Sequence, residues 1–459
     1  MNALFFSAIF GVIMMFSAVL LRQKSAMRAL AIAGMLFLLL VNILEMNGTV
    51  LIHFNTAGMM EFDRFALLVN TILISSTLIY FLLSARDIEK AGQDYGEYFT
   101  LIFFILAGSF LVASFKSLLI FFLGIEIISI PLYILTGADK RNLKSNEASL
   151  KYFLMGVFST GIMLMGITLI YGAAGSFEVA KLNLGGENVS ALTIAGMLLL
   201  LFSMSFKVSA APFHFWTPDV YDGAPTVFTS FMATIVKAAL FIGFIRLFDE
   251  SFGALSATWQ LWVAVLTAAT LFVGNITAVF QQSVKRMLSY SSIAQAGFML
   301  MALFAMNNAA KEGILLYAAA YSLATIGIFA VLARMSDYTF EGFNGLARQQ
   351  PLIAATLTIC ILSLAGIPLT AGFLAKFYML KAVLTTGAHF WLLIFAVLMA
   401  AVSAYYYFRV IQAMYFKEGN ATISANTTFK TTLVVLAALI ILLGLFRESY
   451  LTGFILDRI

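Results

Sequence analysis

The stretch PLIAATLTICILSLAGIPLTAGFLAKFYMLKAVL (351–384) contains thirty-four residues, of which only Lys376 and Lys381 are charged. A straight helix of that length would run ~51 Å at ~1.5 Å per residue, whereas the hydrocarbon core of a bilayer is ~30 Å thick. Gly366, Pro368 and Gly372 lie near its middle. Irregular backbone at membrane depth is tolerated only where protein or a water-filled cavity surrounds it. The stretch therefore predicts a membrane helix that breaks inside the protein.

The composition of the whole chain agrees with a membrane protein. Of its 459 residues, 62% are hydrophobic and 11% are charged, and the mean hydropathy is +0.98. Soluble domains carry about 25% charged residues, so an ordinary soluble protein is excluded. An outer-membrane barrel is disfavoured because alternating strands would dilute the hydropathy. We expect an all-α polytopic membrane protein with no room for a sizeable soluble domain.

Apolar runs, interrupted by charged or Gly/Asn-rich stretches, predict about fourteen transmembrane helices. They lie at 2–21, 27–44, 65–84, 98–115, 117–135, 150–171, 190–211, 224–247, 257–280, 287–306, 311–333, 351–384, 388–413 and 430–446. The first run has no basic residue before it, and Arg22, Lys24 and Arg28 follow it. This predicts an outward N-terminus and not a cleaved signal peptide.

The distribution of basic residues predicts the orientation. Of the 27 Lys and Arg residues, sixteen lie in or beside connections after odd-numbered spans, eight lie on the other side, and Lys207, Lys237 and Lys376 lie within spans. Basic residues concentrate in cytoplasmic loops. We therefore expect the odd connections in the cytoplasm and both termini on the outer, periplasmic side of a bacterial inner membrane.

The seventh predicted span resembles the twelfth, because FKVSAAPFHFWTPD (206–219) places Pro212 and Pro218 directly after an apolar run. Two broken helices five spans apart are typical of an inverted repeat. We expect discontinuous spans seven and twelve, and two inverted five-helix repeats formed by spans 4–8 and 9–13. The predicted units are an N-terminal three-helix segment (1–97), the two repeats (98–248 and 257–415) and a C-terminal helix (416–459).

Four ionisable residues lie within apolar spans: Glu126, Lys207, Lys237 and Lys376. Each costs a few kcal/mol at membrane depth and is by default a functional candidate. Burial weakens the hold of a lysine on its proton, and a nearby carboxylate strengthens it. A carboxylate that moves can therefore switch a lysine between holding and releasing a proton. Glu126 with Lys207 is the natural pair, with Lys237 and Lys376 as onward stations of a proton path.

A plainer interpretation is snorkelling, in which a long lysine reaches the headgroups. Depth argues against it for Lys237, while helix breaks leave more room for it at Lys207 and Lys376. Lys151, near the start of the sixth span, fits snorkelling and proton transfer equally well. His214 lies beside the first break, where it could pass protons or cap freed backbone groups.

Cysteine and histidine counts limit the cofactors. The single Cys360 permits no thiolate cluster, and the three histidines are too scattered for a haem or zinc site. The sequence has no phosphate-binding Gly loop. We expect no metal and no cofactor on this chain, and no nucleic-acid partner.

The motifs together resemble a known family. They are FFLGIEIISIPLYIL (121–135), EASLKYFLMG (147–156), FKVSAAPFHFWTPDVYDGAPT (206–226), MATIVKAA (232–239), VKRMLSYSSIAQAGF (284–298) and LAGIPLTAGFLAKFYMLKA (364–382). In this order they resemble the antiporter-like membrane subunits of respiratory complex I, the NADH-quinone oxidoreductase, and most closely its subunit N.

Three details favour subunit N over its relatives L and M. TSFMATIVKAA (229–239) lacks a histidine that types L and M usually carry ahead of the eighth-span lysine. The terminal channel residue is Lys376, where type M has a glutamate. The chain also ends after the fourteenth span, whereas type L continues into a long lateral helix.

The resemblance implies two half-channels, a central polar axis, and proton translocation driven by NADH oxidation and quinone reduction in partner subunits. It implies that Glu126, Lys207, Lys237 and Lys376 match the functional positions of the family, and that Lys151 matches its sixth-span lysine. FMN, iron–sulfur clusters and quinone are implied in partner subunits. Gln295 departs from the pattern because many relatives have a protonatable histidine there, which puts a relay through span ten in doubt.

Two other functions stay open. An Mrp-type Na⁺/H⁺ antiporter subunit has the same buried charges, and only the resemblance of residues 229–239 to subunit N separates the two. A structural scaffold between neighbouring pumps would also be a membrane bundle. Buried charges stabilise proteins poorly, so the scaffold explains them less well.

Overall fold

The structure, a computed structural model, describes residues 1–21, 23–92, 94–182 and 189–445. These residues form helices and short connections. The principal helices are α1 (Asn2–Leu20), α2 (Lys24–Met46), α3 (Arg64–Ile88), α4 (Tyr95–Ser114), α5 (Leu118–Thr136), α6 (Leu143–Ala174), α7 (Ala191–Lys207), α8 (Trp216–Gly223), α9 (Thr226–Phe231), the π-helical η2 (Met232–Val236), α10 (Lys237–Phe252), α11 (Ser256–Val279), α12 (Val284–Ala305), α13 (Asn308–Leu332), α14 (Leu346–Gln349), α15 (Pro351–Ala365), α16 (Ala371–Thr385), α17 (Phe390–Phe416) and α18 (Thr427–Leu445).

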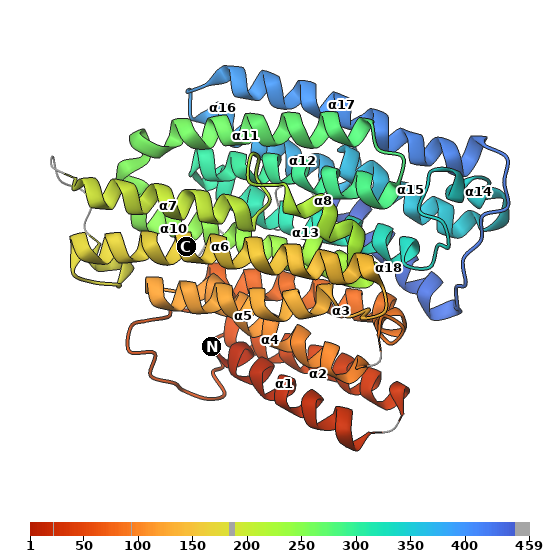
Figure 1. Ribbon diagram of the computed structural model, residues 1–459, viewed down its shortest axis with the longest axis horizontal. Coiled ribbons are helices and arrows are strands. Elements are labelled where there is room, and N and C mark those ends of the chain that lie inside the picture. The colour runs from red at the N-terminus through yellow and green to blue at the C-terminus, as the bar shows by residue number, and fades with distance from the viewer. Residues whose placement is uncertain (22, 93, 183–188, 446–459) are drawn as a thin grey trace.

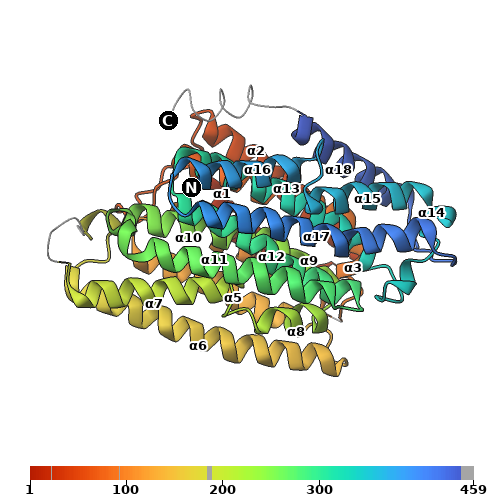
Figure 2. The same cartoon turned by 90° about the horizontal axis from the view of Figure 1, so that it is seen from above.

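The long helices run roughly side by side in one bundle, with α1 and α2 at one edge and α17 at the opposite edge (Figure 1). The view from above places α6 and α7 along a third border and α12 within the bundle (Figure 2). Helix α12 packs against α11, α13, α16 and α8, and α13 packs against α3, α15 and α16. Helices α10, α12 and α13 therefore form the centre of the fold.

The outer helices present apolar side chains at the bundle surface. Val19 of α1, Phe158 of α6 and Phe416 of α17 are each more than 70% exposed. A soluble monomer rarely exposes apolar patches on this scale. Eleven helical stretches of the described chain are long and apolar enough to cross a membrane, and α7 and α15 are apolar but shorter. The bundle therefore has the surface of a multi-span membrane protein.

Both predicted helix breaks are present. Helix α7 ends at Lys207 and α8 begins at Trp216, while α15 ends at Ala365 and α16 begins at Ala371. Gly366 ends α15 with a left-handed φ of +83°, a conformation that glycine adopts without steric cost. Gly372 was expected in the break but lies inside α16. It is a glycine there because a Cβ atom would overlap the backbone of Ser363.

Several predicted boundaries were wrong. Helix α6 begins at Leu143, not at residue 150, so Lys151 lies two turns inside it. The seventh apolar run ends at Lys207, not at residue 211. The eighth span contains the π-helical turn η2, which hydropathy does not reveal. The last residue of the run 430–446 and the C-terminus lie outside the described residues.

Candidate functional site

Glu126 and Lys207 lie close together between three helices. Glu126 projects from α5, Lys207 is the last residue of α7, and Lys207 Nζ lies 3.9 Å from Glu126 Oε1. Thr160 of α6 joins them: its hydroxyl donates to Glu126 Oε1 at 2.9 Å and accepts from Lys207 Nζ at 3.4 Å. Lys207 Nζ also donates to Ser129 Oγ at 2.9 Å. The predicted pair is thus brought together, with hydroxyls completing the shell of the ammonium.

The break after Lys207 is held by side chains that follow it. Trp216 Nε1 donates to the Phe206 carbonyl at 3.1 Å, which satisfies one acceptor at the end of α7. The Thr217 hydroxyl donates to Ser209 Oγ at 2.7 Å. His214 lies within the break, is 8% exposed, and stacks on the ring of Phe215 at 4.7 Å. Among the described residues its Nδ1 has no hydrogen-bond partner.

Lys237 lies at the centre of the bundle, directly after the π-helical turn η2. It is 2% exposed, and its Nζ donates to the carbonyl and hydroxyl oxygens of Ser292 on α12, at 3.0 and 2.6 Å. The hydroxyl of Tyr321 on α13 donates to the same Ser292 Oγ at 2.9 Å. Single π-helical turns often occur at functional positions. Here the turn immediately precedes the lysine in the helix.

Lys376 of α16 reaches back to the end of α15. Its Nζ donates to the carbonyls of Leu364 and Ala365 at 2.8 and 3.0 Å. These are free carbonyls at a helix C-terminus, where the helix dipole favours a cation. The ammonium also lies 4.8 Å from the centre of the Phe298 ring. The fixed dipole of α15 therefore takes the place of a counter-ion.

Gln295 links the surroundings of Lys376 to those of Lys237. Its amide donates to the Leu364 carbonyl at 3.0 Å and to Tyr407, and its oxygen accepts from Tyr317. Tyr317 lies one helical turn before Tyr321, which contacts Ser292. Gln295, Tyr317, Tyr321 and Lys376 share the lining of a cavity of about 10 Å³, close to the space one water molecule needs. The two lysines are therefore joined by polar groups.

Lys151 differs from the three central lysines. Its side chain is 43% exposed and forms ion pairs with Glu147 at 2.7 Å and Asp219 at 3.0 Å. Asp219 of α8 also pairs with Arg286 at 3.1 Å. By contrast, Lys207, Lys237 and Lys376 are each 7% exposed or less, and their ammonium groups end on protein acceptors. The snorkelling interpretation is therefore wrong for those three, whereas Lys151 does reach the bundle surface.

The burial of three basic side chains was not predicted from the sequence. Lys285 is 3% exposed although its position at the start of a span suggested a loop anchor. Arg334 pairs with Asp87 of α3 at 2.9 Å, with both side chains buried.

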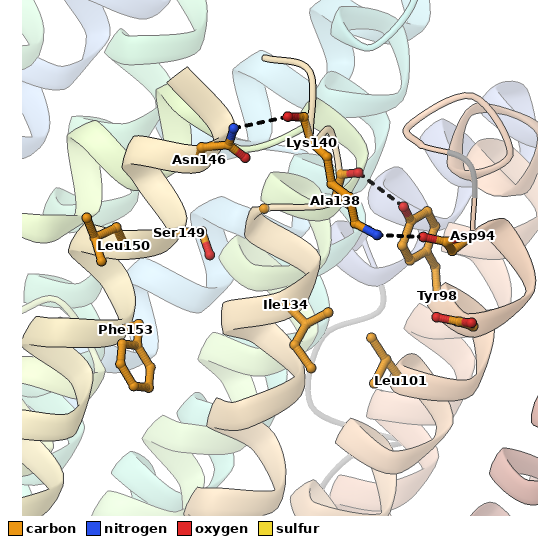
Figure 3. A pocket seen from close by; sticks show the side chains of 12 residues that line it. Asp94, Tyr98, Leu101, Ile134, Ala138, Lys140, Asn146, Ser149, Leu150 and Phe153 are labelled. Atoms are coloured by element: carbon orange, nitrogen blue, oxygen red, sulfur yellow. Dashed lines mark hydrogen bonds and ion pairs between the residues drawn. The ribbon is translucent and has the colours of Figure 1, made fainter. Parts of the chain in front are cut away.

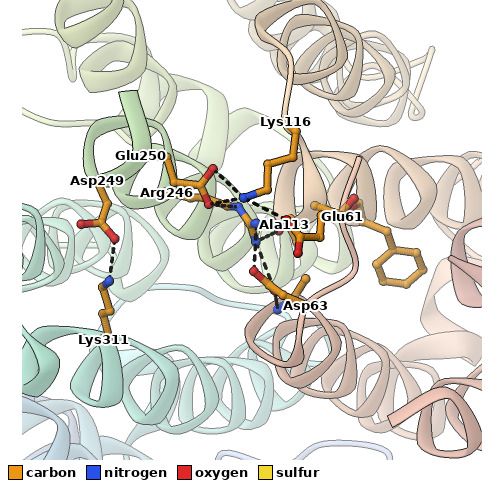
Figure 4. Close-up of polar contacts among 11 residues, drawn as sticks. Glu61, Asp63, Ala113, Lys116, Arg246, Asp249, Glu250 and Lys311 are labelled. Atoms are coloured by element: carbon orange, nitrogen blue, oxygen red, sulfur yellow. Dashed lines mark hydrogen bonds and ion pairs between the residues drawn. The ribbon is translucent and has the colours of Figure 1, made fainter. Parts of the chain in front are cut away.

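Arg246 of α10 pairs with Asp63 at 2.9 Å and, within its own helix, with Glu250 at 2.9 Å. Lys116 and Glu61 extend this cluster (Figure 4). All three buried basic side chains lie near span ends, where hydropathy does not separate buried charges from exposed ones.

A shallow pocket of about 420 Å³ between α4, α5 and α6 holds no predicted site residue (Figure 3). Lys140 donates to Asp94 at 3.0 Å at its rim, and this hydrogen bond raises the pKa of Lys140. Leu101, Ile134 and Phe153 line the pocket below the rim. In the described residues, no group of three or more His, Cys, Asp or Glu side chains could hold a metal ion.

Comparison with known proteins decides the family. A family model described as "NADH:quinone oxidoreductase/Mrp antiporter, TM" matches residues 116–403. NADH-quinone oxidoreductase subunit N of Cytophaga hutchinsonii is 39% identical, over 98% of this chain and 99% of its own length. The chain belongs to this family. The resemblance seen in the six motifs is thereby confirmed.

Two solved structures share the fold. A chain of respiratory complex I from Thermus thermophilus with bound aureothin has a TM-score of 0.83 and 31% identity, and the match covers 98% of each chain. A chain of the Mrp complex from Dietzia sp. has a TM-score of 0.85, covering 96% of this chain and 94% of the other. At 17% identity the second match shows the fold alone.

Proposed function

We propose that this chain is the subunit N of a bacterial NADH:quinone oxidoreductase and translocates protons across the inner membrane. Partner subunits oxidise NADH and reduce quinone, and this chain performs no redox chemistry. The observation that carries the proposal is the Glu126–Lys207 pair beside a broken helix, in which Lys207 is buried and the Glu126 side chain is 22% exposed. Ionisable groups at such depth are retained for transport.

The geometry supports a switch at this pair. While Glu126 is ionised and close, it stabilises the ammonium of Lys207. If the carboxylate moves away or takes a proton, Lys207 retains only the hydroxyls of Ser129 and Thr160. A buried ammonium without a counter-charge is costly, so the proton leaves. Lys237 receives it in the centre, and Lys376 is the last station.

Lys151 and His214 have secondary places in this path. Lys151 lies in an open recess of about 270 Å³ with Asp219 and Arg286, where water can reach it. His214 lies within the break between α7 and α8 and could pass a proton across it. Gln295 can order water between Lys237 and Lys376 but cannot carry charge, so the proton must pass it through water.

The proposed architecture has fourteen spans, with α7/α8 and α15/α16 as discontinuous spans seven and twelve. The segment 1–97 precedes two inverted repeats, 98–248 and 257–415, and 416–459 forms the C-terminal unit. The excess of basic residues after odd spans supports a periplasmic N-terminus and C-terminus. FMN, iron–sulfur clusters and quinone belong to partner subunits, and neighbouring antiporter-like subunits contact this chain in the membrane arm.

Replacing Lys207 tests the proposal. In inverted membrane vesicles, Lys207→Ala should lower NADH-driven proton pumping while native electrophoresis still shows the assembled complex. A pumping stoichiometry equal to that of the wild type would remove Lys207 from the mechanism. Lys181→Ala is a matched control, because Lys181 is exposed and its ion-pair partner among the described residues is Glu178, three residues away.

An Mrp-type Na⁺/H⁺ antiporter subunit is the alternative function, because a chain of an Mrp complex has the same fold. Native electrophoresis of membranes with a tagged chain, stained for NADH oxidation, separates the two functions. Migration with a large NADH-oxidising complex supports the proposal. Migration without NADH activity would favour the antiporter, and Na⁺-driven proton exchange would then be the assay.

A further inference from the structure

An open cavity of about 420 Å³, here called the vestibule, lies at the end of the bundle where α3 ends and α6 and α12 begin. Its ionisable lining comes from five connections that follow odd-numbered spans, together with the adjoining helix ends. These groups are Asp87, Lys90, Asp139, Lys144, Asp222, Lys285 and Tyr338. Connections after odd-numbered spans together hold sixteen of the 27 Lys and Arg residues, so the vestibule opens on the predicted cytoplasmic side.

Lys285 forms the inner wall of the vestibule. It is 3% exposed, and its Nζ donates to the carbonyls of Asp222 and Ala224 at 2.8 and 2.7 Å. The ammonium also faces the ring of Tyr338 at 5.4 Å. Within the described part of the chain it forms no ion pair with a carboxylate. A buried cation whose hydrogen-bond acceptors are neutral carbonyls is costly to keep charged.

A polar stripe leads from Lys285 into the bundle along α12. Ser289 and Ser292 follow Lys285 at four and seven residues, so the three lie on one face of the helix. All three are buried, with Ser289 fully inaccessible. Ser292 is the residue that receives both hydrogen bonds from Lys237. The stripe spans roughly 10 Å at ~1.5 Å per residue.

We propose that Lys285 is the first buried proton acceptor of a path from the vestibule to Lys237. A proton from vestibule water binds the neutral amine of Lys285. The resulting ammonium gives a proton to a chain of the Ser289 hydroxyl and water molecules, and the neutral amine of Lys237 takes up the proton at the other end. Lys285 returns to the neutral amine. The inference rests on the proposed function and adds a route by which protons reach the central lysine.

The competing role for Lys285 is structural. Asp222 and Ala224 lie at the C-terminus of α8, and a fixed cation there would cap its free carbonyls. Lys285→Arg separates the two roles. Arginine keeps the charge and the donors but does not release its proton, so a cap survives the substitution and a relay does not. Ser289→Ala tests the stripe without touching the cap.

The experiment measures protons pumped per NADH oxidised in vesicles with the complete complex, after native electrophoresis confirms assembly. We expect Lys285→Arg and Ser289→Ala to lose pumping toward the level of Lys237→Met. Lys417→Arg, an exposed lysine after α17, is the control for the first. Ser109→Ala is the control for Ser289→Ala. Ser109 is as buried as Ser289, and each hydroxyl donates to the carbonyl four residues before it.

Wild-type pumping in Ser289→Ala would overturn the path along α12, whatever Lys285→Arg does. Wild-type pumping in an assembled Lys285→Arg complex would overturn the proton-relay role of Lys285 and support its role as a cap of α8. If Lys285→Arg does not assemble, Ser289→Ala decides alone. Lys237→Met keeps the two proposals apart: normal pumping in that variant contradicts the proposed function itself, whereas a loss there beside normal Lys285→Arg contradicts only the vestibule path.

Discussion

The lysines at the two helix breaks have different partners for their ammonium groups. Lys207 is the last residue before its break and faces the carboxylate of Glu126, with two hydroxyls around its ammonium. Lys376 follows its break and reaches back to the carbonyl end of α15. A carboxylate can move or take a proton, whereas a helix end is a fixed dipole. We therefore propose that the charge of the lysine at the first break can be switched, whereas the lysine at the second break has a constant environment.

The largest effect is expected from Gly366→Val. A side chain at φ +83° costs roughly 1–2 kcal/mol, and a Cβ atom would lie 2.9 Å from Lys376 Cδ. The ammonium should be displaced from the α15 carbonyls, and proton pumping should be lost. Gly387→Val is the control, since Gly387 has a φ of +67° and no atom of the described residues lies within 4 Å of a Cβ added there. Equal losses in both variants would show that backbone strain alone is responsible.

A double-mutant cycle tests the switchable partner. Glu126→Gln should lower pumping, and adding it to Lys207→Met should cause little further loss because the two act as a unit, with a coupling of roughly 0.5–3 kcal/mol. Adding Glu126→Gln to Lys376→Met should multiply the losses, since these residues share no hydrogen-bond partner in the described chain. If the losses of pumping in Glu126→Gln and Lys207→Met were additive, the two residues would not act as a unit, and the proposed difference between the two breaks would be wrong.

A smaller effect is expected at Thr160, whose hydroxyl joins the pair at the first break. Thr160→Val keeps the shape and removes a hydrogen bond worth about 1 kcal/mol, or roughly fivefold in rate. Pumping rates measured in vesicles should fall by that order. Thr168→Val on the same helix is the control because, within the described residues, its hydroxyl donates to the Leu164 carbonyl and to no other group. If both variants pumped normally, the Thr160 hydroxyl would have no part in proton transfer.

The smallest effect is expected at the aromatic partner of the second break. Phe298→Leu removes a ring 4.8 Å from Lys376 Nζ, an interaction worth ~0.5–2 kcal/mol. The helix dipole remains, so pumping should fall only slightly more than in Phe252→Leu. Phe252 is equally buried but packs against the ring of Phe248 at 5.1 Å. A severe loss in Phe298→Leu alone would mean that the dipole is not the main stabiliser of Lys376.

Both breaks and the burial of three lysines were predictable from sequence, because Gly, Pro and long apolar runs act locally. The proximity of Glu126 to Lys207 was also expected, from charge alone. The acceptors of Lys237 and Lys376 were not, since they are a serine and two carbonyls without a distinctive sequence pattern. The burial of Lys285 was not predicted, because a lysine beside a predicted loop has the same sequence whether it faces water or the inside of the bundle.

By itself, then, the sequence determined a membrane bundle with two interrupted helices and a set of charges too deep for a structural purpose. The physical reason is that hydropathy and backbone preference are properties of neighbouring residues. Only the tertiary structure decided which group contacts each lysine: a carboxylate for Lys207, Ser292 for Lys237, a helix end for Lys376 and the carbonyls at the C-terminus of α8 for Lys285. Those partners depend on how separate helices are rotated and packed against one another, which no single stretch of the chain specifies.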